Sequence, residues 1–160
     1  MKILITGGLG FIGSNLVKYL VSKKSITKIL IVDDFSKSSL KYIDTITKYK
    51  FFPSAKSYKK SNNRVQVIKS DVNNKKLALI VTKSIDYVIH LAAESGVDTS
   101  IYKPYESFQT NVLGAFNYLD ACRVNNIKRF IFASSGAVFG NTKPPLKETN
   151  IRLPISPYGS

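Results

Sequence analysis

The chain has 160 residues, 44% of them hydrophobic, and a mean hydropathy of −0.03, which predicts one globular domain with its own core and excludes a disordered chain. Lys and Arg number 24 against 10 Asp and Glu, and the resulting formal charge of +14 is typical of proteins that bind nucleic acid or anionic membranes. Because the lysines are scattered among Asn, Ser and Ile, we expect neither a nucleic-acid nor a membrane partner.

The first stretch predicts a strand, a glycine turn and a helix. Residues 3–5 are an apolar run typical of a buried strand, and apolar residues recur at helical spacing from Phe11 to about Lys23. The turn between them satisfies both Gly-x-x-Gly-x-x-Gly and Gly-x-Gly-x-x-Gly through Gly7, Gly8, Gly10 and Gly13. Bare glycine backbone lets a pyrophosphate approach the N-terminus of the helix, and Gly13 would let that helix pack close to the strand.

A second predicted strand, from Lys28 to Val32, ends in Asp33 and Asp34. Asp33 comes 20 residues after Gly13, close to the roughly 20 expected for an acid that bonds the ribose hydroxyls of a dinucleotide. The strand, helix and strand form a βαβ unit, which should have a right-handed crossover and parallel strands. This context favours a dinucleotide-binding turn over a merely structural one.

Residues 36–63 have a different composition, with seven lysines, one acid and five aromatics. Leu40, Ile43 and Ile46 predict one helix that ends before Pro53, and residues 54–63 predict an exposed loop. Basic residues interleaved with aromatics also line single-stranded nucleic-acid grooves. The scattered spacing of the aromatics favours instead a solvated insertion that covers a sheet edge.

The rest of the chain continues the alternation of strands and helices. Strands are predicted at 64–68, 85–91 and 127–133, and helices at 73–82 and from Pro104 to about residue 125. Such alternation predicts an α/β fold with a doubly wound parallel sheet. In the long helix, the spacing predicts a buried face, with Asn111 on the same side, made of Phe108, Val112, Ala115, Leu119 and Cys122.

Polar residues fall at the carboxyl ends of the predicted strands, where ligands bind in parallel sheets. They are Asp33, Asp71, His90, Ser134 and Ser135. Asp71 could instead cap the next helix, and the two serines could simply close their strand. We expect His90 to pack and hydrogen-bond locally and not to titrate in catalysis.

Seven motifs, in this order along nearly the whole chain, resemble the extended short-chain dehydrogenase/reductase family. They are Gly7-Gly8-Leu9-Gly10-Phe11-Ile12-Gly13, Asp33-Asp34, Ser70-Asp71-Val72, His90-Leu91-Ala92-Ala93-Glu94-Ser95, Asn111-Val112-Leu113-Gly114, Phe132-Ala133-Ser134-Ser135-Gly136-Ala137-Val138-Phe139-Gly140 and Ser156-Pro157-Tyr158-Gly159. The branch that the chain is most similar to is the NAD-dependent nucleotide-sugar epimerases and dehydratases, of UDP-glucose 4-epimerase type. The resemblance implies a Rossmann-like NAD-binding domain.

The resemblance also implies the roles of individual residues. Those implied for NAD are Gly7, Gly10, Phe11, Ile12 and Gly13 at the pyrophosphate, Asp33 at the adenosine ribose, Asp71 and Val72 at the adenine, Leu91, Ala92 and Ala93 in the cleft, and Asn111 in its support. A carboxylate at Asp33 repels a 2′-phosphate and so favours NAD over NADP. Ser135 would hydrogen-bond the sugar oxygen that undergoes redox, and Tyr158 would transfer its proton. Without the other motifs, Tyr158 would be an ordinary turn residue.

Some features depart from the family pattern. Gly136-Ala137 stands where 4,6-dehydratases carry an Asp-Glu pair that eliminates water, which favours an epimerase. The stretch from Ala92 to Asp98 nevertheless also resembles the dehydratase branch. Phe139 replaces the tyrosine that is usual there, so no hydroxyl contact is expected from it.

The family's catalytic lysine would be residue 162, and its smaller domain for the nucleotide-sugar would follow. We therefore expect residues 1–160 to be an incomplete NAD-binding domain without the C-terminal substrate domain, with little or no turnover alone. A homodimer is possible for the longer protein. The alternatives are a dehydratase or keto-sugar reductase of the same family, a non-catalytic NAD-binding module, and a basic RNA-binding protein that uses residues 36–63.

Other sequence features bound the setting of the protein. The single cysteine, Cys122, excludes an intramolecular disulfide and fits a reducing cytoplasm. No stretch approaches the roughly 18 apolar residues of a membrane span, and glycines interrupt the apolar start too early for a signal peptide. No cluster of His and Cys has metal-ligand spacing, so no metal site is expected.

Overall fold

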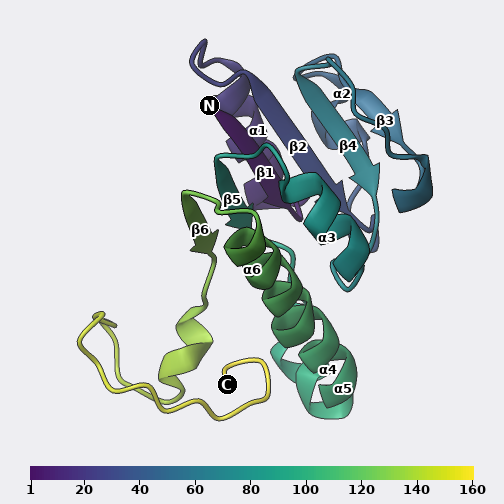
Figure 1. Cartoon of the computed structure of the whole chain (residues 1–160). Coiled ribbons are helices and arrows are strands. Elements are labelled where there is room, and N and C mark those ends of the chain that lie inside the picture. Colours follow the sequence, from purple (N-terminus) through teal and green to yellow (C-terminus); the bar gives the residue numbers. More distant parts are fainter.

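The computed structural model describes residues 1–160, and its centre is one parallel sheet (Figure 1). Six strands lie in the order β3-β4-β2-β1-β5-β6. They are β1 Lys2–Thr6, β2 Lys28–Asp33, β3 Lys50–Phe52, β4 Val65–Lys69, β5 Tyr87–His90 and β6 Arg129–Phe132. The α/β fold with a parallel doubly wound sheet is therefore confirmed.

Helices connect most of the strands. They are α1 Phe11–Val21, α2 Lys41–Asp44, α3 Lys75–Thr82, α4 Val97–Tyr102, α5 Pro104–Phe108 and α6 Ala115–Val124, with 3-10 segments η1 Ala55–Ser57 and η3 Gly136–Phe139 and a π-helical segment η2 Gln109–Gly114. The short helix α4 was not predicted. The predicted long helix consists of α5, η2 and α6 in succession.

Strand β1 lies at the middle of the sheet, between β2 and β5. Thr6 at its end is level with Val32 of β2 and with His90 of β5. The loops that follow these three strands therefore meet at one edge of the sheet, which is where ligands bind in such folds.

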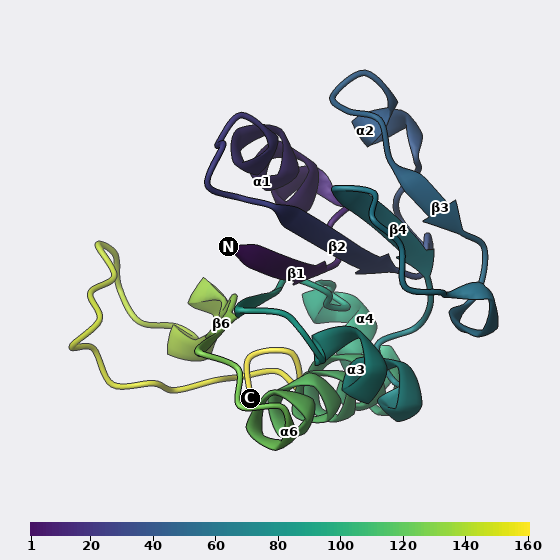
Figure 2. The ribbon, with the colours of Figure 1, turned by 45° about the horizontal axis from the view of Figure 1, so that its top comes forward.

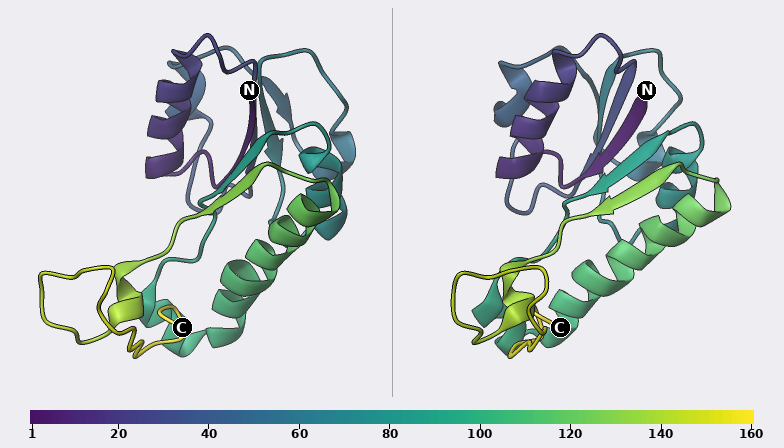
Figure 3. Two further views of the ribbon diagram at one scale, coloured as in Figure 1. Left: turned by 60° about the vertical axis from the view of Figure 1, so that its left-hand side comes forward. Right: turned by 90° about the vertical axis from the view of Figure 1, so that its left-hand side faces the viewer.

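Helices cover both faces of the sheet: Figure 2 and the left panel of Figure 3 show α1 on one face and α3 with α6 on the other. Successive strand residues point to opposite faces. Ile3 and Ile5 accordingly share a core with Val17 of α1, whereas Leu4 shares a second core with Tyr118 of α6. The apolar runs of β1 and β2 are explained by this burial on two sides.

Residues 36–63 contain an edge strand that the sequence did not predict. The predicted helix is reduced to the four residues of α2, and β3 follows it, pairing in parallel with β4. Phe52 of β3 is buried and packs edge-on against Tyr58, with ring centroids 5.2 Å apart. The insertion thus covers the edge of β4, as expected, and Phe52 and Tyr58 pack inward, not along an exposed groove.

The buried face of the long helix lies one residue away from most of the predicted one, so the prediction was wrong for Phe108, Val112 and Leu119 and was confirmed for Cys122. Phe108, Val112 and Leu119 are 47%, 50% and 50% exposed. The buried residues are Ser107, Gly114, Tyr118, Ala121 and Cys122. A Cβ on Gly114 would lie 2.5 Å from Val72 Cγ2, so the helix approaches Val72 too closely for a side chain at that position, whereas Tyr118, one turn later, is fully buried.

After β6 the chain leaves the sheet and runs beyond the carboxyl ends of the strands, as the yellow segment in Figure 3 shows. It returns at Tyr158, whose backbone N–H donates a 3.1 Å hydrogen bond to Ser100 Oγ of α4. No helix combines the length and the apolar character needed to cross a bilayer.

Candidate functional site

In the glycine turn after β1, neighbouring backbone atoms leave no space for a side chain at two positions. Gly7 has φ of +67°, and a Cβ there would lie 2.7 Å from the backbone nitrogen of Ala92. A Cβ on Gly13 would lie 2.4 Å from the carbonyl oxygen of Gly7. The turn therefore brings β1, α1 and the loop after β5 into direct backbone contact.

Gly10 leaves the N-terminus of α1 open. It is the N-cap residue, no side chain caps the helix, and the first turn contains no acid. A Cβ on Gly10 would meet only the carbonyl oxygen of Gly7, at 3.4 Å, so the fold alone does not require glycine there. The free N–H groups and the positive end of the helix dipole are available to an anion.

The Asp33 side chain lies beside this turn, and its carboxylate accepts hydrogen bonds from two backbone N–H groups and one hydroxyl. It is 6% exposed; Oδ2 accepts the Leu9 N–H at 2.9 Å, and Oδ1 accepts the Phe35 N–H at 3.0 Å and the Ser38 hydroxyl at 2.7 Å. A carboxylate oxygen can accept two hydrogen bonds, so Oδ2 keeps one position for a further donor.

A groove of about 160 Å³ lies in front of the turn and collects most of the predicted cofactor residues. These are Gly7, Gly10, Asp33, Asp71, Val72, Leu91, Ala92 and Ala93. Phe11 and Ile12 are 87% and 64% exposed at the start of α1 and, like the buried Gly13, do not line it.

Other residues, to which the sequence patterns assigned no role, also line the groove. They are Asp34, Ser36, Lys37, Ser38, Ser70, Glu94 and Thr110. The polar run directly after Asp33 was the available signal, but residues 36–63 were interpreted together as an insertion. Only the structure shows that the beginning of this run turns back to Asp33 through Ser38.

Asp71 does not cap a helix. Its Oδ1 accepts the Asn73 N–H at 2.7 Å, whereas Oδ1 of Asn74 accepts the Leu77 N–H at 3.0 Å and caps α3. Asp71 is therefore exposed at the groove with its carboxylate oriented by a local turn.

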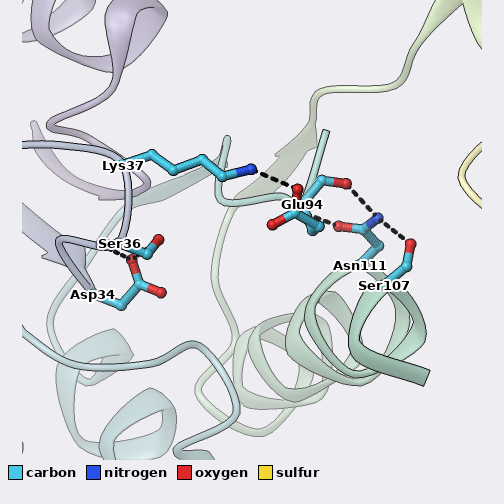
Figure 4. Close-up of polar contacts among 6 residues, drawn as sticks. All are labelled: Asp34, Ser36, Lys37, Glu94, Ser107 and Asn111. Atoms are coloured by element: carbon cyan, nitrogen blue, oxygen red, sulfur yellow. Dashed lines mark hydrogen bonds and ion pairs between the residues drawn. The ribbon is translucent and has the colours of Figure 1, made fainter. Parts of the chain in front are cut away.

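Asn111 fixes the loop that follows β5. Its Oδ1 accepts the Glu94 N–H at 2.9 Å, and its Nδ2 donates to the Glu94 carbonyl at 3.0 Å and to Ser107 Oγ at 3.2 Å (Figure 4). Asn111 lies within the π-helical segment η2, whose wider turn is common at functional sites. The amide on the buried side of the helix thus satisfies both backbone groups of one loop residue.

A second hollow, with a volume of about 540 Å³, adjoins the groove. It is mainly apolar, and no Asp or Glu lines it. Ala92 and Ala93 line both hollows, so the two are continuous. Ser135 and Tyr158 both line the second hollow; Ser135 Oγ also accepts the Ala137 N–H at 3.1 Å and caps η3.

His90 lies beneath the loop that follows β5 and packs as expected. Its Nδ1 is 2.9 Å from Thr6 Oγ1, and its ring stacks on Phe132 with centroids 5.9 Å apart. Burial lowers the pKa of His90 to about 4, so the ring is neutral at pH 7. His90 thus packs between aromatic rings at the end of β5, which is the local packing and hydrogen bonding that the sequence predicted.

The chemistry of the continuous groove suits a dinucleotide. The uncapped helix has free N–H groups that suit a phosphate, Oδ2 of Asp33 has one acceptor position that suits a hydroxyl, and the lining of the second hollow suits an apolar ring. A parallel sheet with a glycine turn after its central strand and an acid after the neighbouring strand defines a Rossmann-like α/β domain.

Comparison with known proteins places the domain in a family. Residues 4–160 match the family model described as GDP-mannose 4,6 dehydratase. The chain belongs to this family, of the short-chain dehydrogenase/reductase type, whose relatives include epimerases and dehydratases of nucleotide sugars.

Individual relatives agree over almost all of the chain. The UDP-glucose 4-epimerase of Lactobacillus helveticus is 33% identical, over 99% of this chain and 43% of that protein. The solved UDP-N-acetylglucosamine 4-epimerase of Methanobrevibacter ruminantium, in complex with UDP-N-acetylmuramic acid, has a TM-score of 0.80 and 34% identity over 99% of this chain and 46% of its own.

The UDP-glucose 4-epimerase of Brucella ovis, solved in complex with NAD, has a TM-score of 0.79 and 26% identity over 99% of this chain and 43% of its own. The chain spans less than half the length of the curated relatives it matches, for example 42% of the UDP-glucose 4-epimerase of Halalkalibacterium halodurans.

Proposed function

We propose that this chain is the NAD-binding part of a nucleotide-sugar 4-epimerase that acts on a UDP-linked sugar. The observation that carries the proposal is the continuous groove, whose polar half ends at Asp33 and whose apolar half contains Ser135 and Tyr158. The names of the relatives agree with this choice, since several are UDP-sugar 4-epimerases.

Each part of the groove would hold one part of the cofactor. Oδ2 of Asp33 would accept an adenosine ribose hydroxyl, and the backbone from Gly7 to Gly10 would face the pyrophosphate. When bound, NAD supplies an acceptor for hydride from the sugar and returns that hydride to the opposite face. The two acids Asp33 and Asp34 disfavour the additional phosphate of NADP.

Ser135 and Tyr158 would handle the sugar hydroxyl. The Ser135 hydroxyl would hydrogen-bond the sugar oxygen, and Tyr158 Oη would take its proton and later return it. The apolar lining, which includes Phe132 and Val138, would keep water away from the oxidised sugar. Asn111 would keep the loop of Ala92 and Ala93 in place while the sugar turns over.

The apolar hollow favours an epimerase over a dehydratase. Elimination of water needs a general acid and base, and the hollow has no carboxylate. Gly136 and Ala137, where dehydratases of this family carry acids, form the first turn of η3 and offer no titratable side chain.

Cofactor binding is tested by thermal melts of the wild-type chain and Gly10→Ala with NAD or NADP. A bound ligand stabilises the fold by RT ln(1 + [L]/Kd), about 2.7 kcal/mol at a hundredfold excess over Kd. We expect NAD to raise the Tm of the wild type and NADP to have little effect. Gly10→Ala should melt like the wild type without ligand, because its Cβ meets no close neighbour, but gain little from NAD. A wild-type Tm that NAD leaves unchanged contradicts the proposal.

The reaction is tested with the full gene product, UDP-glucose or UDP-galactose, and NAD. Interconversion of the two sugars without net reduction of NAD supports the epimerase. A 4-keto-6-deoxy product would establish the dehydratase instead. Tyr158→Phe should abolish conversion while the NAD-induced rise in Tm persists, because only the proton-transferring hydroxyl is lost.

A further inference from the structure

The groove contains one basic side chain among several acids. Lys37 lines it together with Asp33, Asp34, Asp71 and Glu94. The ammonium of Lys37 does not point at the open groove, because its Nζ lies 2.5 Å from Glu94 Oε1. Figure 4 shows the Lys37 side chain extending from the loop after β2 to Glu94 on the loop after β5.

Lys37 starts from the part of the groove where the adenosine ribose would lie. The next residue, Ser38, donates its hydroxyl to Asp33 Oδ1 at 2.7 Å. In dinucleotide sites a basic side chain beside the ribose-binding acid is the feature that accommodates the 2′-phosphate of NADP. Lys37 has the position and the charge for that contact, but it is engaged elsewhere.

Glu94 is the fixed partner of this ion pair. Both of its backbone polar groups are bonded to the Asn111 side chain, and Asn111 is bonded in turn to Ser107. The Glu94 side chain is 24% exposed, against 60% for Lys37. The backbone of Glu94 is therefore held and its side chain is the less exposed of the two, whereas the longer Lys37 side chain extends across the groove to reach it.

We propose that Glu94 is a specificity-determining residue, which holds the Lys37 ammonium away from the ribose and so keeps the groove selective for NAD over NADP. The inference rests on the proposed function, since it assumes that Asp33 faces the adenosine ribose. Without Glu94, the freed ammonium would offset the acids at this end of the groove and attract a 2′-phosphate.

The test measures the Kd of NAD and of NADP by isothermal titration calorimetry for the wild type, Glu94→Gln, Lys37→Gln and the double variant. Glu94→Gln should bind NADP about tenfold more tightly while its affinity for NAD changes much less, because one phosphate–ammonium pair is gained. The double variant should return to the wild-type preference. Glu106→Gln, the same change on α5 outside the groove, should leave both affinities unaltered.

Three results would overturn the inference. The ratio of NAD to NADP affinity could stay at the wild-type value in Glu94→Gln. The gain in NADP affinity could persist in the double variant, which would assign it to lost repulsion by Glu94 and not to Lys37. If Glu94→Gln does not melt cooperatively, the Lys37→Gln variant is the test. In that variant the Glu94 carboxylate has lost its ion pair and should weaken the binding of NADP more than the binding of NAD. An unchanged ratio of NAD to NADP affinity in Lys37→Gln contradicts the inference.

A wild-type chain that binds neither cofactor contradicts the proposed function, and this inference with it. NAD binding by the wild type, with an unchanged preference in the variants, contradicts this inference alone.

Discussion

The glycines of the turn after β1 differ in how strictly the fold requires them. Packing requires glycine at position 13, because a Cβ on Gly13 would lie 2.4 Å from the Gly7 carbonyl oxygen and 2.6 Å from Gly8 Cα. Gly10 has room for a Cβ and lines the groove, so the fold alone does not require a glycine at this position. The glycine pattern in the sequence does not distinguish these two cases, since it reports only where a side chain is missing.

We expect Gly13→Ala to lower the free energy of unfolding by about 2 kcal/mol, because backbone atoms must move apart to admit the methyl group. Urea unfolding followed by circular dichroism measures the loss. Gly136→Ala is the matched control, since its Cβ would meet nothing closer than Leu146 Cδ1 at 3.9 Å. Equal stability of the two variants would contradict the packing of α1 on the turn.

The buried His90 predicts a pH dependence of stability. Burial lowers the pKa of His90 from 6.5 to about 4, so between these values the unfolded state binds more protons than the folded one. The stability that this residue contributes is full above about pH 6.5 and is lost as the pH falls toward 4. The loss from pH 7 to pH 5 should be about 2 kcal/mol.

Urea unfolding at both pH values checks this, with His90→Gln as comparison. The variant should lose less stability over the same interval, because carboxylates titrate equally in both proteins. The same pH dependence in both would show that His90 does not carry the effect.

At the scale of elements, the π-helical segment η2 and the loop after β5 act as one unit through Asn111. We expect Asn111→Ala to cost about 2 kcal/mol of unfolding free energy, because the Glu94 N–H and carbonyl both lose their partner. Asn117→Ala is the matched control, since that side chain makes one long bond, 3.4 Å, to the Val72 carbonyl.

Hydrogen exchange separates this local effect from global loss of stability. The Glu94 amide should exchange faster in Asn111→Ala even where the central strands keep their protection. Unchanged protection of Glu94 would mean that the loop is held by other contacts.

The elements also show where sequence patterns stop being informative. The apolar runs and the glycine turn predicted β1, α1 and β2 well, because burial on both faces of the sheet demands continuous apolar residues. Most of the face of the long helix was predicted wrongly because large apolar residues such as Phe108 and Leu119 remain about half exposed. Gly114 instead lies against Val72 and Tyr118 is fully buried, and the apolar spacing of the sequence does not distinguish these two sides of the helix.

Parts of the candidate site that depend on contacts between segments far apart in the sequence could not be predicted either. Asp33 was found because a fixed spacing marks it, whereas Lys37 and Glu94 meet across 57 residues of sequence. Strand β3 was missed because its three residues are too short to show a period.

At the scale of the whole molecule, one exposed face of the long helix is apolar. Phe108, Val112, Phe116 and Leu119 lie on it and are between 47% and 57% exposed, and the last three also line the second hollow. Exposed apolar patches of this kind favour association. We expect the chain to self-associate as its concentration rises, and sedimentation velocity over a concentration series measures this.

Phe116→Glu should shift the chain toward the monomer, because it places a charge at the middle of this face. Tyr42→Glu, at a residue that is 55% exposed on α2, is the control and should associate like the wild type. A monomeric wild type at every concentration, or equal association of both variants, would show that this face does not associate.

The end of β1 and the loop after β5 are in contact in the folded protein, although the ribosome makes them at different times. The Ala92 N–H donates to Thr6 Oγ1 across 86 residues of sequence, and β1 lies between strands made early and late. A ribosome releases the glycine turn and Asp33 first, when the opposite wall of the groove does not yet exist. The groove is therefore complete only after translation has passed β5, when the loop of Leu91 to Glu94 joins the earliest segment.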